Sequence, residues 1–281
     1  MEPFNRVERE NHPPLFYIAS WMQQFPGLSA GFTSRHGGVS ESPFSSLNCG
    51  LHVHDSAEHV VSNRERLADA IGMPFQAFTY AEQVHGKDIC VVTAAEKGMG
   101  RASREHAIQA RDGFITKEKG QVLCALFADC VPLFFYDPVR EAAGLAHAGW
   151  KGTVLNIASA TINAMHQAFG SEPQDIRAAI GPSIGVCCYE IDNVVADQVK
   201  GVIMNNHSES DYSNKVLIAQ PGNKYKLNLQ ELNRNFIEKA GIMSSHIEVT
   251  QLCTSCSTDD FFSHRKEGGS TGRMAAWIAM S

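Results

Sequence analysis

Residues 122–152, "VLCALFADCVPLFFYDPVREAAGLAHAGWKG", contain three apolar runs separated by short polar turns. The runs "VLCALFA", "PLFFYD" and "AAGLAHAG" have the length of strands, and turn-forming residues bound them. The stretch therefore predicts three successive β-strands. Cys130 lies where the first run ends, and His147 lies inside the third.

Similar β-rich runs recur along the chain: "GFTSR", "DICVVTA", "DGFIT", "IRAAIGP" and "HIEVTQLC". Helical patterns lie between some of them. After "GWKG", the apolar residues from Val154 to Phe169 recur every three or four positions, which predicts one helix that ends at Gly170. "HVVSNRERLADAIG" and "LNLQELNRNFIEKAG" have the same pattern. Because strands and helices do not alternate strictly, the sequence favours an α+β fold over a doubly wound sheet.

The composition is that of a packed globular chain. Its 281 residues are 43% hydrophobic, and no low-complexity linker or repeat divides them. We therefore expect a single domain over residues 1–281, in which residues 1–30 form an N-terminal extension and the first elements.

Charge and hydropathy exclude several classes of protein. The net charge is −6, and basic residues form no cluster that could displace counterions from nucleic acid. The N-terminus is polar, and no apolar run is long enough for a signal peptide or a membrane span. We expect a cytoplasmic protein with reduced thiols, in which each of the eight cysteines is a core residue or a ligand.

Three residues suggest a metal site. Cys130 lies at a strand end, from which a side chain can leave the core, although a single free cysteine is more often a packing residue. His147 lies among small residues in "GLAHAGWKG", and His85 precedes a glycine in "EQVHGK". Each histidine could equally be a structural residue whose ring N–H donates a hydrogen bond to a backbone carbonyl. Together, two imidazoles and one thiolate suit zinc and leave a fourth position for water or substrate.

Two other groups of residues have open alternatives. "CTSC", from Cys253 to Cys256, has CxxC spacing without a second such pair; pairing with Cys187 and Cys188 is conceivable, and so is a redox or incidental role, so its function is left open. Cationic residues are candidates for anion binding, with a surface charge or a plain turn as the alternative: Arg35 before two glycines in "TSRHGGVS", Lys151 at a helix start, and Arg64 and Arg265 in polar segments.

The motifs resemble, in order, those of the laccase-domain, polyphenol-oxidase-like family, which is described as purine nucleoside phosphorylases with adenosine deaminase activity. The motifs are "TSRHGGVS", "NCGLHVHD", "NRERLADAIG", "QVHG", "FADCVPLFFYD", "AHAGWKGT", "AAIGPSIG", "CYEID" and "FFSHRKEGGSTGRMAAWIA". They extend from about Gly31 to the C-terminus. Family members usually have leucine at Cys49 and often arginine at Lys151, so a planar guanidinium fork is lost at that position.

The resemblance implies a layered α/β/β/α fold and a metal site of His85, Cys130 and His147. It implies zinc, or copper, as the cofactor. The implied reaction is phosphorolysis of adenosine, inosine or methylthioadenosine to the free base and ribose 1-phosphate, with zinc-dependent deamination of adenosine. Arg35, Lys151, Arg64 and Arg265 are then the candidates for phosphate binding, and Asp129 for orienting a ligand or moving protons.

Three alternatives use the same residues. Copper-dependent oxidation of phenols fits imidazole and thiolate ligands, but one three-ligand site provides no histidine-rich array for reducing oxygen. A metal-free hydrolase would use Cys130 as nucleophile and His147 or His85 as base. A zinc-stabilised interaction module would need a fourth protein ligand.

Overall fold

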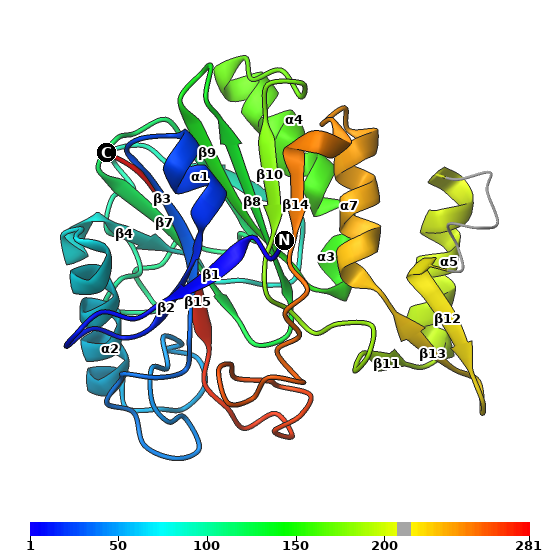
Figure 1. Cartoon of the computed structure of the whole chain (residues 1–281), viewed down its shortest axis with the longest axis horizontal. Coiled ribbons are helices and arrows are strands. Elements are labelled where there is room, and N and C mark those ends of the chain that lie inside the picture. Colours follow the sequence, from blue (N-terminus) through cyan, green and yellow to red (C-terminus); the bar gives the residue numbers. More distant parts are fainter. Residues whose placement is uncertain (207–214) are drawn as a thin grey trace.

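The structure, a computed structural model, describes residues 1–206 and 215–281. Its first sheet has six strands in the order β1-β2-β3-β15-β7-β4. These strands are β1 (Phe4–Val7), β2 (Leu15–Ile18), β3 (Leu28–Thr33), β15 (Met274–Met280), β7 (Gln121–Phe127) and β4 (Phe78–Tyr80). The C-terminal strand β15 lies between β3 and β7 and is antiparallel to both. The first and last segments of the chain are thus joined within one sheet (Figure 1).

The second sheet also has six strands, in the order β14-β10-β8-β9-β6-β5. They are β14 (Ile247–Val249), β10 (Arg177–Ile180), β8 (Val131–Asp137), β9 (Ala142–Ala148), β6 (Gly113–Thr116) and β5 (Ile89–Val91). The strands predicted from residues 122–152 are β7, β8 and β9. The first belongs to one sheet and the other two form an antiparallel hairpin at the centre of the second sheet.

Alternate side chains of these strands enter different layers. Leu123 and Phe127 of β7 pack between the two sheets, whereas Cys124 faces the helix on the outer side of the first sheet. In β8, Phe134 points between the sheets and Phe135 toward the helices on the other side. Because both faces of these strands are covered, their sequences are apolar throughout rather than alternating.

Helices cover the outer faces of both sheets. On the first sheet lies α2 (Ala57–Ile71), which begins at Ser56 and ends at Gly72 in the left-handed conformation. On the second sheet lie α3 (Trp150–Val154), α4 (Ile157–Phe169) and α7 (Leu229–Lys239). The short elements α1 (Ala19–Gln24), η1 (Phe75–Ala77) and η2 (Ser244–His246) complete this body. The predicted α+β fold class and its α/β/β/α layering are confirmed.

One predicted helix is in fact two. The pattern between Val154 and Phe169 predicted a continuous helix, but the chain breaks at Asn156, which has a φ of 60°. The Asn156 side chain accepts a hydrogen bond from the backbone N–H of Ser159 and so caps the start of α4. The predicted end at Gly170 is confirmed, since this glycine has a φ of 68° in the left-handed region.

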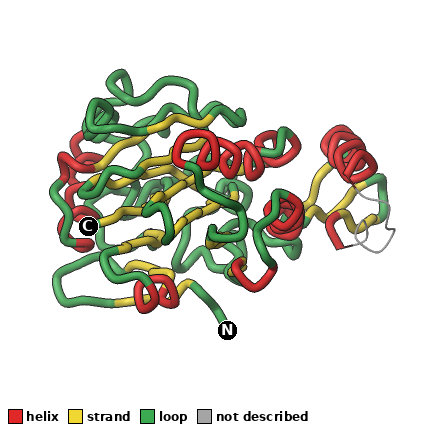
Figure 2. The backbone as a smooth tube through the Cα atoms, turned by 90° about the horizontal axis from the view of Figure 1, so that it is seen from above, coloured by secondary structure: helices red, strands yellow, loops and turns green. Residues whose placement is uncertain are grey.

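A small unit projects from the layered body (Figures 1 and 2). It contains α5 (Asn193–Asn206) and a three-stranded sheet in the order β11-β13-β12. These strands are β11 (Glu190–Ile191), β13 (Lys224–Leu227) and β12 (Leu217–Gln220). None of the described helices is long and apolar enough to cross a lipid bilayer.

Candidate metal centre

Three separate segments bring His85, Cys130 and His147 together. Cys130 lies in the turn between β7 and β8, and His147 is the second-last residue of β9. The β8–β9 register pairs Pro132 with His147, so the residue just before β8 lies beside the end of β9. Pro132 is the second residue of β8. The predicted position of Cys130 at a strand end is confirmed.

The ligand atoms of the three residues lie within 4.8 Å of one another. Cys130 Sγ is 3.9 Å from His85 Nε2, and the two imidazole rings meet edge to face with centroids 4.8 Å apart. This separation leaves room for one ion between the three donors. We call these three residues the triad.

Asp112 fixes the geometry of the triad. Its carboxylate accepts a 2.9 Å hydrogen bond from Nδ1 of the buried His147 and further ones from the backbone N–H groups of Val84, His85 and Gly86. The bond to Nδ1 directs Nε2 of His147 toward the other two ligands. A carboxylate behind a ligating imidazole is typical of metal sites, because it orients the ring and increases its basicity.

The electrostatics of the triad favour a thiolate. Burial would raise the pKa of Cys130, but the charge and hydrogen bonds of His147 and His85 outweigh it and lower that pKa to about 6. Burial would lower the pKa of His147, but Cys130 and Asp112 raise it to about 9. Burial opposes ionisation of Asp112, yet its hydrogen bond with His147 lowers the pKa of the carboxyl group. These shifts favour the ionised sulfur, the form that binds metals.

The backbone around the triad is strained. His85 has a φ of 61° and Asp129 a φ of 86°, in the left-handed region that side chains other than glycine rarely adopt. Gly149 lies directly against the ligands: a Cβ at this position would be 2.8 Å from the His85 ring and 3.1 Å from Cys130 Sγ. Strained residues concentrate at functional sites, where the surrounding structure holds them in place.

The donor set fits a borderline-soft metal ion. Imidazole nitrogen and thiolate sulfur are ligands that zinc and copper both accept, and three protein ligands leave one tetrahedral position open. The triad is thus a candidate metal site with an open side.

Two hollows meet at the triad, and both are lined by His85, Cys130 and His264. The first, of about 400 Å³, is also lined by charged and polar residues: His52, Glu82, Gln83, Arg104 and Arg273. The second, of about 320 Å³, has an apolar and aromatic wall: Trp150, Ile184, Tyr189 and Leu229. We call them the polar hollow and the aromatic hollow.

Two of the predicted cations line the aromatic hollow. Lys151 reaches it from the start of α3, and Arg265 from the loop before β15. The Arg265 guanidinium lies 5.1 Å from the Tyr189 ring and donates to the Glu190 carbonyl. Among the described residues, no carboxylate forms an ion pair with either cation. Both charges are therefore available to an anion in this hollow.

Asp129 also lines the aromatic hollow, but both of its carboxylate oxygens have partners. They accept a 2.6 Å bond from Thr254 Oγ1 and a 2.7 Å bond from the Arg265 backbone N–H. The Asp129 carbonyl accepts the Ile184 N–H. These contacts position the loops of the hollow around the triad.

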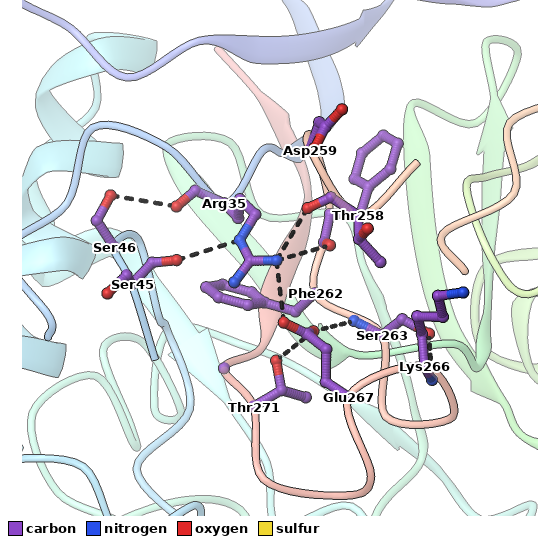
Figure 3. A network of polar contacts seen from close by, with 12 residues as sticks. Arg35, Ser45, Ser46, Thr258, Asp259, Phe262, Ser263, Lys266, Glu267 and Thr271 are labelled. Carbon is purple, nitrogen blue, oxygen red and sulfur yellow. Dashed lines mark hydrogen bonds and ion pairs between the residues drawn. The ribbon is translucent and has the colours of Figure 1, made fainter. Parts of the chain in front are cut away.

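Arg35 does not line either hollow. Its guanidinium forms an ion pair with Glu267, donates to the carbonyls of Ser45 and Thr258, and lies over the Phe262 ring (Figure 3). The neighbouring N–H groups of the predicted anion-binding turn are also engaged, since those of Gly38 and Val39 bond to the side chains of Ser46 and Asn63. The structure gives Arg35 a role in joining loops, and phosphate binding there stays a prediction.

Arg64 is only 2% exposed and lies on the inner face of α2. It donates from Nε to the Cys49 carbonyl and from Nη1 to the carbonyls of Gly100 and Arg101, and its guanidinium lies 3.8 Å from the Tyr80 ring centroid. The guanidinium that was predicted to bind phosphate therefore already has three carbonyls and an aromatic ring as partners. The geometry separates Arg64 from the triad and gives it a structural role.

Sequence reasoning missed several residues of the site. Asp112 precedes β6 within "RDG", which looks like an ordinary turn; its place directly before a buried strand was the available signal. His264 and Tyr189 lie in quoted motifs but were not singled out. Tyr189 became part of the site because the loop after β10 returns beside Asp129.

Comparisons with known proteins agree with this architecture. The family described as "Multi-copper polyphenol oxidoreductase laccase" matches residues 29–281. A Bacillus subtilis strain 168 protein named purine nucleoside phosphorylase YlmD is 42% identical over 271 residues, 95% of each chain. The crystal structure of YlmD from Geobacillus stearothermophilus has a TM-score of 0.92 at 40% identity and covers 100% of this chain and 99% of that one. The Bacillus licheniformis hypothetical protein YfiH has a TM-score of 0.91 at 41% identity, with full coverage of both chains.

Proposed function

The chain belongs to the multi-copper polyphenol oxidoreductase laccase family, as the motifs predicted, and we propose that it is a metal-dependent purine nucleoside phosphorylase. Relatives named purine nucleoside phosphorylase support the reaction. The observation that carries the proposal is the aromatic hollow, which places beside the triad an aromatic wall and two cations that form no ion pair with any described residue.

The hollow offers what a nucleoside and phosphate need. Trp150 and Tyr189 provide flat apolar surface for a purine, since aromatic rings stack on bases without sequence preference. Lys151 and Arg265 provide positive charge for phosphate at the same site. Holding both reactants in one cavity removes much of the entropic barrier to their reaction.

The chemical step is a displacement at the sugar. A phosphate oxygen forms a bond to the anomeric carbon, the bond from that carbon to the purine nitrogen breaks, and the purine leaves with the electron pair and takes up a proton. His264 lines both hollows and is placed to donate that proton. Asp129 holds the Arg265 backbone in position, so its role in the proposal is to position the phosphate-binding loop.

We propose zinc as the ion held by His85, Cys130 and His147. Zinc in this triad would supply Lewis-acid chemistry, which serves the departing purine and also the deamination of adenosine, in which water replaces the exocyclic amine and ammonia leaves. Asp112 keeps the His147 ring oriented for this role. A cytoplasmic location with reduced thiols belongs to the same proposal, and all eight cysteines are unpaired.

Two rival functions use the same triad. Copper-dependent phenol oxidation would need a histidine-rich array to reduce oxygen. Among the described residues, the only other cluster of potential ligands consists of four cysteines, so no second imidazole site accompanies the triad. A metal-free cysteine hydrolase is favoured by the lowered pKa of Cys130, about 6, which makes the sulfur nucleophilic.

The decisive experiment incubates metal-quantified protein with adenosine, with and without phosphate, and separates the products. Adenine and ribose 1-phosphate that form only with phosphate would support phosphorolysis. Inosine that forms regardless of phosphate would support deamination. The Cys130→Ala variant should lose both activities. If metal-loaded protein yields neither product, the proposal fails; hydrolysis that survives metal removal would favour the cysteine hydrolase.

A further inference from the structure

Four cysteines from two distant segments converge outside the triad. Cys187 and Cys188 lie in the loop between β10 and β11, and Cys253 and Cys256 lie in the turn after β14. Their sulfur atoms all lie within 4.8 Å of one another. We call this group the sulfur cluster. The proposed reaction makes no use of it.

The spacing of the sulfurs suits a tetrahedral ion. The Cys188–Cys256 and Cys187–Cys256 sulfur separations are 3.3 and 3.5 Å. Zinc–sulfur bonds of about 2.3 Å in a tetrahedron place neighbouring sulfurs about 3.8 Å apart. A disulfide would need about 2.05 Å. All four thiols are unpaired, so the cluster offers four donors at metal-site distances.

The backbone is shaped around the sulfurs. Gly185 donates its N–H to Cys253 Sγ at 3.2 Å, a bond that would stabilise a ligating thiolate. A Cβ at Gly185 would lie 3.2 Å from Cys187 Sγ and 3.5 Å from Cys253 Sγ, so a larger residue here would crowd the two loops. Lys226 donates to the Cys187 carbonyl and brings positive charge to the cluster.

Backbone contacts already align the two segments. Ser183 and Cys253 form a parallel bridge, and the Thr254 N–H donates to the Ser183 carbonyl at 3.0 Å. The N–H of Cys256 donates to the Cys253 carbonyl, which closes the CxxC turn. The two cysteine pairs are thus held face to face by hydrogen bonds that do not involve their side chains.

We propose that Cys187, Cys188, Cys253 and Cys256 form a second metal site, a closed tetrathiolate site for one zinc ion with a structural role. Four protein ligands without an open position are typical of structural zinc, whereas the triad keeps a position free for chemistry. The ion ties together two loops that border the aromatic hollow, since Tyr189 follows Cys188 and Thr254 bonds to Asp129. This inference does not depend on the proposed reaction.

The test counts zinc per chain in protein that is purified under reducing conditions, supplied with zinc and freed of weakly bound metal. The Cys130→Ala variant, which has lost a triad ligand, should retain one zinc. A Cys188→Ser/Cys256→Ser double variant should lose one zinc relative to the parent, and the control Cys90→Ser, a cysteine outside both clusters, should lose none. The variants are compared by circular dichroism.

X-ray absorption at the zinc edge of Cys130→Ala makes the test independent of how the double variant folds. Four sulfur neighbours at about 2.3 Å and no nitrogen are expected. The inference is overturned if Cys130→Ala binds no zinc, if its zinc has nitrogen or oxygen neighbours, or if mass spectrometry of the reduced, zinc-supplied protein finds a disulfide within the cluster. Because these measurements do not involve nucleosides, their failure is separate from failure of the proposed reaction.

Discussion

Asp112 and His147 are joined by a 2.9 Å hydrogen bond that fixes which nitrogen of the imidazole faces Cys130. The same carboxylate accepts the backbone N–H of His85, so one side chain positions two of the three triad residues. The positions of His85 and His147 therefore depend on a residue that is not itself one of the three ligands.

The Asp112→Asn variant should bind metal about 10–100-fold more weakly, because an amide cannot accept from four N–H donors with the strength of a carboxylate. Affinity measured by competition with a chelator would check this. Asp137→Asn is the matched control, since Asp137 is also buried but bonds to Val139 and Arg140 in a distant turn. Equal affinity in all three proteins would contradict the positioning role of Asp112.

Gly149→Ala should disrupt the metal site, because the added methyl group would overlap the His85 ring and press on Cys130. We expect loss of most of the metal bound by the triad and of the activity, while the far-ultraviolet circular dichroism stays the same. Gly201→Ala is the control: no atom of the described residues lies within 4 Å of its added Cβ, and alanine favours the helix. A Gly149→Ala protein with full metal content would show that the loop yields easily.

Arg64→Met should lower the free energy of unfolding by about 3 kcal/mol or more, because it leaves three carbonyls, two of them buried, without their charged donor. Urea unfolding would measure this. Arg66→Met, an exposed arginine of the same helix, should change it little. Should Arg64→Met instead keep its stability and raise the KM for phosphate, the predicted role of Arg64 in phosphate binding would be restored.

Lys151→Gln should lower kcat/KM for phosphate about tenfold or more, because one charge-assisted contact is worth about 1.5–3 kcal/mol. Lys151→Arg should retain activity, since it keeps the charge and adds a planar fork. Steady-state kinetics with varied phosphate would measure both. Lys239→Gln, which removes an exposed charge near the end of α7, is the control. If Lys151→Gln matches this control, phosphate binds elsewhere.

His52 should make stability depend on pH. Desolvation within the polar hollow, followed by the charges of Arg273 and Arg104, lowers the pKa of His52 from 6.5 to about 4. The unfolded chain therefore binds this proton first, so the contribution of His52 to stability should fall as pH decreases from about 6.5 to 4 and stay constant above 6.5. His52→Gln should flatten this part of the profile. The change should be modest, because the His52 side chain lines the hollow but is still exposed to solvent. Unfolding curves at pH 5 and 7.5 would measure the free energy of unfolding of both proteins. The same change between the two pH values in His52→Gln and in the parent would contradict the prediction.

The sequence by itself determined the local elements. The apolar runs at residues 122–152 became strands, and Gly72 and Gly170 ended α2 and α4, because strand and helix formation depends on neighbouring residues and on backbone conformations that glycine adopts freely. The family motifs also pointed to His85, Cys130 and His147, which the structure brings together. The break at Asn156 was missed because the apolar spacing continues across it, whereas the left-handed turn interrupts the helix.

Only the tertiary structure decided which side chains meet. His147 lies beside Cys130 because the β8–β9 register pairs it with Pro132, and that register depends on the turn between the two strands and on which faces the layers bury. The same long-range packing brought Asp112 to the triad, joined the two cysteine pairs and directed Arg35 and Arg64 away from the hollows. Side chains that are distant in sequence share no local signal, so their proximity is established only when the layers close around the core.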